Sequence, residues 1–261
     1  MSRTVRIVLS AMLAAGGLGV VAHAQAPTIQ VVPGQTPIWQ YVSLNYIALS
    51  AYGVPALPLS NNSLYFVDIP PFEFGGEDFS EIAIASNGYV SVGPFGSGSE
   101  PNQDLPDPTP PNGVLAPFWT ALDLDAGGAV YAAPVDLGPI LYYVVDWEDV
   151  PDANNLTNLN SFEVWLELAS GTTNVEGITY GYGHVDAPAD GMATIGAENI
   201  YGNVGDDYYY NGTGTLPADQ AGLAVITSGS PNLPEPSTFV LMGTGLAAVG
   251  FAGRRRKVSK L

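Results

Sequence analysis

The side chains of this chain that could do chemistry are mostly carboxylates, and two of them share a turn. Asp123 and Asp125 stand at alternate positions just ahead of two glycines. Calcium binds through several oxygen ligands, so this spacing predicts a calcium site. Acids of other loops are candidates for further ligands: Asp104, Asp107, Asp206 and Asp207. The turn lacks the third ligand and the terminal glutamate of an EF-hand. A turn whose acids face water is the alternative, and no other cofactor is expected.

A second group of acids lies in residues 161–169, where apolar residues alternate with polar ones. A strand would place Glu163, Trp165 and Glu167 together on one face. Two carboxylates beside an aromatic ring could bind or hydrolyse a glycan. In so acidic a chain such pairs arise by chance, so a solvated sheet face is the simpler interpretation. A carbohydrate-binding or glycan-active protein is the alternative.

General-base chemistry depends on one residue, because His184 is the sole histidine of residues 25–233. A serine triad needs such a base and a positioned nucleophile, but the chain has no Gly-x-Ser-x-Gly elbow. We therefore expect a solvent-facing or hydrogen-bonded histidine, no catalytic residue and no enzyme. The absence of cysteine excludes thiol nucleophiles, zinc–thiolate sites and iron–sulfur clusters.

Charge is divided sharply along the chain. All seven Lys and Arg residues lie near its two ends, so residues 25–233 contain neither type. All but one of the 25 acidic residues lie in that same stretch. Such a polyanion cannot neutralise phosphates, which excludes nucleic-acid binding and disfavours phosphorylated substrates. The charge keeps the stretch soluble and favours divalent cations or cationic partners.

The N-terminal end has the three parts of a secretory signal peptide over residues 1–24. Two arginines come first, an apolar run follows, and the small residues Ala22 and Ala24 close the segment. We expect a signal helix, export by the Sec route and cleavage by signal peptidase after Ala24. Residues 25–37 would follow as an extended lead-in.

The C-terminal end has the composition of a membrane anchor. Residues 228–237 form a linker with a proline-rich motif, and residues 238–253 are uncharged and apolar. The apolar segment is predicted to form a transmembrane helix, although it is shorter than the roughly 20 residues that usually span a bilayer. Residues 254–261 should stay in the cytoplasm, because loops on that side carry the positive charge. The residues expected to stop transfer are Arg254, Arg255, Arg256 and Lys257.

This tripartite order resembles a PEP-CTERM sorting signal. The matching motif residues are Pro234, Glu235, Pro236 and Ser237. The resemblance implies a protein of a Gram-negative bacterium, anchored transiently in the inner membrane and processed near the motif by an exosortase, a membrane enzyme. It also implies a final place at the cell surface or in the extracellular matrix, and a link to exopolysaccharide or biofilm.

Between the two ends, residues 38–227 alternate short apolar runs with turn signals and show no convincing amphipathic helix. Residues 38–52 are predicted as one or two strands, and residues 151–160 as an asparagine-rich loop. Asn87 and Gly88 predict a tight hairpin. The pattern predicts an all-β fold, an antiparallel sandwich of about 10–12 strands.

Landmarks within these strands resemble a β-sandwich of secreted bacterial proteins that is similar to the nidogen-type extracellular domain. They run in order over roughly residues 60–227: Ser86–Gly93, Leu115–Trp119 with Asp123, Asp146–Val150, Phe162–Leu168, Ile178–Tyr182 and Ala193–Asn199. The leading hypothesis for this domain is a structural or adhesive role. The same module accompanies secreted peptidases, so an accessory role beside a peptidase is a further alternative.

Together these features predict a non-enzymatic, exported, surface-anchored β-sandwich that is sorted through its C-terminal end. The expected partners are signal peptidase, an exosortase, the inner membrane and exopolysaccharide. Nucleic acid is not expected to be among them.

Overall fold

The computed structural model describes residues 27–93, 95–99, 101–168 and 177–228. The predicted signal helix, transmembrane helix and sorting motif lie outside these residues and stay predictions. Within the described ranges, no helix has the length and apolar character needed to cross a membrane. Gln25–Asn232 form one compact unit.

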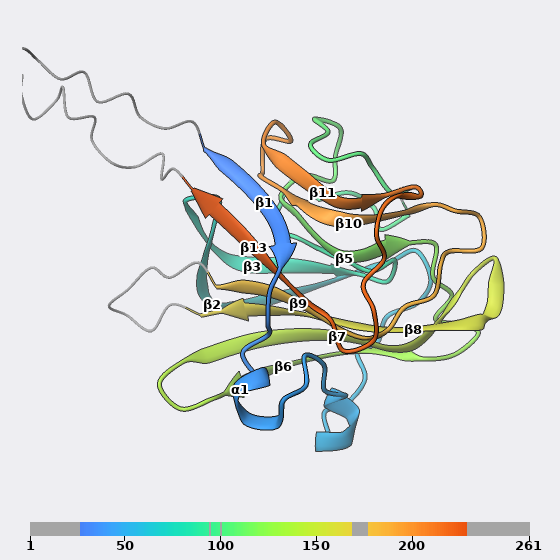
Figure 1. The fold of residues 1–261 in the computed structure, drawn as a ribbon, viewed down its shortest axis with the longest axis horizontal. Coiled ribbons are helices and arrows are strands. Elements are labelled where there is room, and N and C mark those ends of the chain that lie inside the picture. Colours follow the sequence, from blue (N-terminus) through green and yellow to red (C-terminus); the bar gives the residue numbers. More distant parts are fainter. Residues whose placement is uncertain (1–26, 94, 100, 169–176, 229–261) are drawn as a thin grey trace, which may run out of the picture. The chain divides into compact units, whose positions relative to one another are not determined.

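The body consists of two antiparallel sheets packed face to face (Figure 1). The first sheet has six strands in the order β1 (Thr28–Pro33), β13 (Gly222–Ser228), β9 (Ile178–His184), β8 (Asn155–Glu167), β7 (Leu141–Asp152) and β6 (Ala129–Asp136). The second has seven in the order β12 (Thr213–Gly214), β11 (Gly205–Tyr210), β10 (Ala193–Glu198), β5 (Val114–Thr120), β4 (Tyr89–Ser91), β3 (Glu77–Ala85) and β2 (Leu64–Phe74). The predicted all-β sandwich is confirmed.

The main core lies between the sheets and is built from alternate strand residues, as the period-2 pattern requires. Trp147 of β7 is fully buried and stacks on Phe162 of β8, with ring centroids 5.1 Å apart. Its indole Nε1 donates a hydrogen bond to the Ala85 carbonyl of the other sheet at 3.1 Å. Trp147 therefore joins the two layers through both packing and a hydrogen bond.

The predicted hairpin at Asn87 and Gly88 is confirmed, because it joins β3 to β4. Gly88 has a φ of 84°, and a Cβ there would lie 2.0 Å from the Phe118 carbonyl oxygen. The position thus needs glycine for its conformation and for the close approach of β5. The Asn87 side chain is buried and donates to the Asn62 side chain and the Gly98 carbonyl.

Two expectations for local structure were wrong. Residues 38–52 hold the short helix α1 (Trp39–Val42) and the 3-10 turn η1 (Leu49–Tyr52) instead of strands. Each helix ends in a left-handed residue, Ser43 and Gly53, which breaks extended pairing. Residues 151–160 are largely strand, because β7 and β8 continue into a long hairpin whose turn is closed by Asp152 Oδ1, which accepts from the amides of Asn154 and Asn155.

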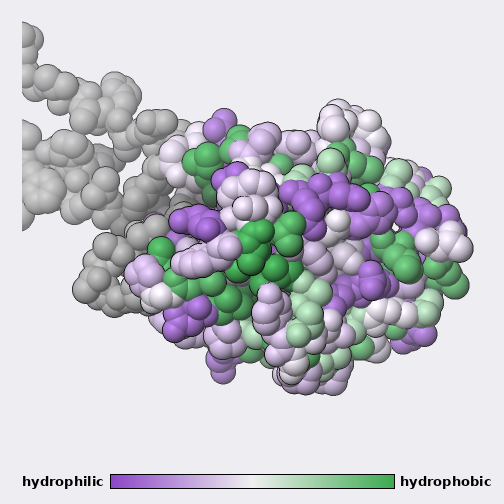
Figure 2. All heavy atoms as spheres, turned by 60° about the horizontal axis from the view of Figure 1, so that its bottom comes forward, coloured by the Kyte–Doolittle hydropathy of each residue, from purple (hydrophilic) through white to green (hydrophobic). Residues whose placement is uncertain are grey.

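Residues 38–54, called the cover segment below, lie on the outer face of the six-stranded sheet. Ile38 and Leu49 of this segment are buried with Tyr142, Val144 and Trp165 of β7 and β8 in a second apolar cluster. Figure 2 brings the side of α1 and β6 forward and shows hydrophobic residues gathered on that face. The first sheet is therefore buried on both of its faces here, which the sequence pattern did not indicate.

Strand β1 lies within the residues predicted as an extended lead-in, and it completes the sandwich. It pairs with β13 so that Thr28 faces Ser228. The Val31 amide donates to Asp206 Oδ2 of the other sheet at 2.8 Å. Both ends of the described body thus leave at the same end of the sandwich (Figure 1).

Candidate functional site

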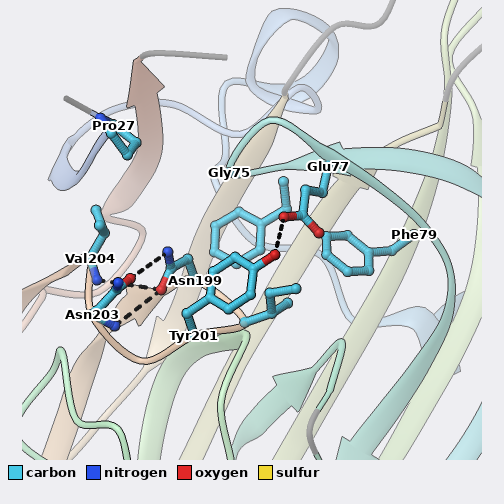
Figure 3. A pocket seen from close by; sticks show the side chains of 10 residues that line it. Pro27, Gly75, Glu77, Phe79, Asn199, Tyr201, Asn203 and Val204 are labelled. Carbon is cyan, nitrogen blue, oxygen red and sulfur yellow. Dashed lines mark hydrogen bonds between the residues drawn. The ribbon is translucent and has the colours of Figure 1, made fainter. Parts of the chain in front are cut away.

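A small pocket opens beside the start of β1, and it is called the end pocket here. It has a volume of ≈ 200 Å³. Its walls come from the β2–β3 turn, the β10–β11 loop and the residue before β1: Phe74, Gly75, Glu77, Phe79, Asn199, Ile200, Tyr201, Asn203, Val204 and Pro27. The lining mixes apolar side chains with amide, carboxylate and phenol groups: Phe79 lies beside Glu77, and Val204 lies beside Asn203 (Figure 3).

Hydrogen bonds hold the polar groups of the end pocket in place. The Tyr201 hydroxyl donates to Glu77 Oε1 at 2.9 Å and so joins the β10–β11 loop to β3 (Figure 3). This bond raises the pKa of the Tyr201 hydroxyl above its usual range. Asn199 Oδ1 accepts from the backbone amides of Asn203 and Val204 at 3.2 and 3.3 Å. The loop is thereby closed on itself before any ligand arrives.

A second group of functional interest lies under the cover segment, where two acids of neighbouring strands face each other. Asp146 of β7 pairs in register with Glu163 of β8, and both are fully buried. Trp165 Nε1 donates to Glu163 Oε1 at 2.6 Å, and the Leu49 amide donates to Asp146 Oδ2 at 3.0 Å. Asp146 Oδ1 and Glu163 Oε2 have no hydrogen-bond partner in the described part of the chain.

Burial decides the protonation of this pair. Loss of solvent raises the pKa of both carboxyls well above their usual range, and the charge of Glu163 raises that of Asp146 further. Glu148 stands next to the pair on the same face and accepts from the backbone amide of Ser50 at 2.8 Å. The cover segment is therefore attached to the sheet through two of its backbone amides, which bond to Asp146 and Glu148.

A second pair of acids, whose pKa values are also raised, links the 101–112 loop to β10 and β11. Glu198 Oε2 accepts from the Asp107 amide at 2.8 Å, and Asp207 Oδ2 accepts from the Leu105 amide at 2.9 Å. Burial is the main cause that raises the pKa of each carboxyl to about 8. Both acids keep one buried oxygen without a partner among the described residues.

Comparison with known proteins agrees with this architecture. A family model described as NIDO related matches residues 50–232, more than half of the chain. The chain belongs to the NIDO-related family. The PEP-CTERM protein-sorting motif matches residues 232–257, directly after the NIDO-related domain. No curated protein and no solved structure matches the chain significantly.

The two matches divide the chain into an exported domain and its sorting signal. A PEP-CTERM signal targets a secreted surface protein to an exosortase, a membrane enzyme. Both the NIDO-related domain and the signal are of non-catalytic types. The predicted cleavage residues Ala22 and Ala24, the motif at 234–237 and the basic residues 254–257 lie outside the described residues and stay predictions.

The structure places the predicted calcium ligands in a hydrogen-bonded turn. Asp123 Oδ1 accepts from the Asn61 side chain at 2.6 Å and from the amides of Asp125 and Ala126 at 3.0 and 3.1 Å. These donors, Asn61 above all, lower the pKa of Asp123. Among the described residues of the NIDO-related domain, no group of three or more His, Asp or Glu stands close enough to hold a metal ion. Calcium binding at this turn stays a prediction.

The expectation that Glu163, Trp165 and Glu167 lie on a solvated face was wrong for the first two. Glu163 and Trp165 are fully buried beneath the cover segment and bonded to each other. A glycan cannot reach either of them, so this pair supports neither sugar stacking nor hydrolysis. The alternation of β8 correctly placed them on one face, but the second layer over that face comes from residues more than a hundred positions earlier in the chain.

His184 of the NIDO-related domain is a surface histidine, as expected. Its side chain is half exposed, and Nδ1 lies 2.7 Å from Asp219 and Nε2 lies 3.3 Å from Asp186. The hydrogen bond to Asp219 raises the pKa of the imidazole. The end pocket was not found from the sequence, because Glu77 and Tyr201 are 124 positions apart and belong to no motif.

Gly181 of β9 sets how closely the cover segment approaches the sheet. A Cβ at this position would lie 1.9 Å from the Asn45 carbonyl oxygen and 2.8 Å from Glu163 Oε1. We expect Gly181→Ala to push the segment away and to lower the free energy of unfolding by about 1–3 kcal/mol, the usual range for overpacking. Thermal unfolding measures the change, and an unchanged midpoint would contradict the close contact.

Proposed function

We propose that the chain is a non-enzymatic exported protein whose NIDO-related domain is delivered to the cell surface or extracellular matrix of a Gram-negative bacterium. Export follows the Sec route, and signal peptidase removes residues 1–24. The C-terminal segment then holds the protein in the inner membrane until an exosortase acts at or near Pro234–Ser237. The delivered sandwich has a structural or adhesive role in a matrix that contains exopolysaccharide.

The observation that supports this proposal is the position of the sorting motif directly behind a complete domain. The motif match begins at residue 232, and β13 ends at Ser228. A cut near residue 234 would therefore leave every described strand intact. The acidic body, which has no Lys or Arg, suits a domain that must stay soluble after release.

The intact mass of the mature protein from cell surface and medium tests the proposal. We expect a chain that begins at Gln25 and ends near residues 234–237, with any group added there. Pro236→Ala should cause the unprocessed chain to accumulate, whereas Pro231→Ala, a proline outside the motif, should be processed normally. A mature mass that retains Leu261 would contradict processing.

Retention at the cell surface is the second readout. Deletion of residues 234–261 removes the sorting signal but none of the described strands. We expect the shortened protein to be exported and then lost from the surface and matrix. Undiminished surface retention of the shortened protein would contradict the proposed role of the signal.

A further inference from the structure

The end pocket has the size of a site for one small ring. Its volume of ≈ 200 Å³ lies below the about 300–1,000 Å³ of pockets that enclose drug-sized ligands. Phe74, Phe79, Ile200 and Val204 supply apolar lining, and Glu77, Tyr201 and Asn203 supply polar groups beside it. A ligand that fits must therefore have an apolar face and polar groups around its edge.

Tyr201 is unusual among the aromatic residues of the pocket in its exposure to solvent. Its side chain is 61% exposed, although it is large and aromatic. The hydrogen bond to Glu77 fixes its hydroxyl and holds the ring at the rim of the pocket (Figure 3). An immobilised ring that faces solvent offers an apolar surface for stacking at little entropic cost.

The polar groups of the rim suit hydroxyls. Glu77 accepts from Tyr201 through Oε1 and has Oε2 left as an acceptor, and Asn203 Nδ2 has no partner among the described residues. A hydroxyl both donates and accepts, so it can meet the carboxylate and the amide alike. The domain has no Lys or Arg to receive an anion. A cationic amine fits less well than a hydroxylated ring, because the lining has one carboxylate, Glu77, and its amide side chains carry no charge.

From this combination we propose that the end pocket binds one neutral sugar ring of a polysaccharide. The C–H face of the ring packs against Tyr201 and the apolar lining, and its hydroxyls meet Glu77 and Asn203. The inference rests on the proposed delivery of the domain into a matrix. A pocket for one ring binds with a Kd on the order of millimolar, and many copies on one surface turn this into firm attachment to a repeating polymer.

Saturation-transfer NMR on the mature protein tests the site with glucose, galactose, mannose and N-acetylglucosamine, and with glucosamine as the cationic probe. We expect transfer to at least one neutral sugar. Tyr201→Ala should weaken its binding about tenfold or more, and Tyr201→Phe, which keeps the ring, should weaken it less. Tyr52→Ala is the matched control, because Tyr52 is 69% exposed and lies on the cover segment.

Three results would overturn the inference. The first is no transfer to any neutral sugar, and the second is transfer that Tyr201→Ala and Glu77→Gln leave unchanged. The third is transfer to glucosamine alone that Glu77→Gln abolishes, which would make the pocket an amine site. Normal processing of the C-terminal signal alongside any of these results would leave the proposed delivery intact. Failed processing together with intact sugar binding would contradict the proposed delivery and leave the sugar site supported.

Discussion

We expect the NIDO-related domain to become less stable as the pH rises from about 5 to about 9, because it buries protonated acids. Burial raises the pKa of Asp146 and Glu163 well above their usual range, and that of Glu198 and Asp207 to about 8. Each of these acids holds its proton more tightly in the folded chain than in the unfolded chain, where carboxyl pKa values lie near 4.

The direction of the effect follows from proton binding. Between the unfolded and the folded pKa the folded domain binds more protons, so the free energy of unfolding falls as the pH rises. The stabilisation is complete below the unfolded pKa and is lost as the pH passes the folded pKa. Each acid contributes at most about 1.4 kcal/mol per pH unit. His184 acts in the same direction, but its half-exposed side chain makes its share small.

Thermal unfolding at pH 5, 7 and 9 and at constant ionic strength measures this dependence. Glu198→Gln keeps the shape of the protonated acid and its acceptor for the Asp107 amide, so we expect a shallower fall of the midpoint with pH. Glu81→Gln is the control, because Glu81 lies exposed on β3. A midpoint that is flat or rises from pH 5 to pH 9 would contradict buried, protonated acids.

The alternation of apolar and polar residues predicted the sandwich because it marks strands that are buried on one face. Strand β7 shows the limit of this prediction. Trp147 and Val145 point into the core between the sheets, and Asp146 and Glu148 point to the other face. The sequence gives no sign that this second face is covered, because polar residues at alternate positions usually indicate solvent. The buried state of Asp146 depends on contacts with Leu49, 97 positions away.

The cover segment could not be predicted for a related reason. Its aromatic and β-branched residues suit strands, but no free edge of the first sheet receives it. The segment lies across the face of the sheet and bonds to acidic side chains through its own amides. Local propensity cannot show such a tertiary arrangement. The end pocket could not be predicted for the same reason, since Tyr201 and Glu77 meet only after β3 and β10 enter one sheet.

The second large effect concerns the two tryptophans on opposite faces of the first sheet. We expect Trp147→Ala to lower the free energy of unfolding by about 3–5 kcal/mol, because it empties the core between the sheets. It also leaves the buried Ala85 carbonyl without its indole donor. For a domain of this size the midpoint should fall by about 2–4 °C for each kcal/mol.

Trp165→Ala should act locally instead. Trp165 packs against Ile38 and Leu49 of the cover segment and donates to Glu163, so its loss removes the apolar contact and the hydrogen bond beneath that segment. We expect the cover segment to open while the two sheets stay folded. Loss of glycan binding in this variant would not show that Trp165 stacks on a sugar, because Trp165 is buried beneath the cover segment.

Limited digestion separates the two cases. Trypsin has no site in residues 25–233, so chymotrypsin is the suitable protease. In Trp165→Ala we expect rapid cleavage after Trp39, Tyr41 or Tyr52, followed by a stable fragment that contains the remaining strands. In Trp147→Ala cleavage should spread over the whole domain as the temperature approaches the lowered midpoint. Phe66→Ala, at a half-exposed position of β2, serves as the control. Uniform cleavage of both variants would mean that cover and sandwich unfold as one unit, because the contacts of the cover segment would then carry stability for both sheets.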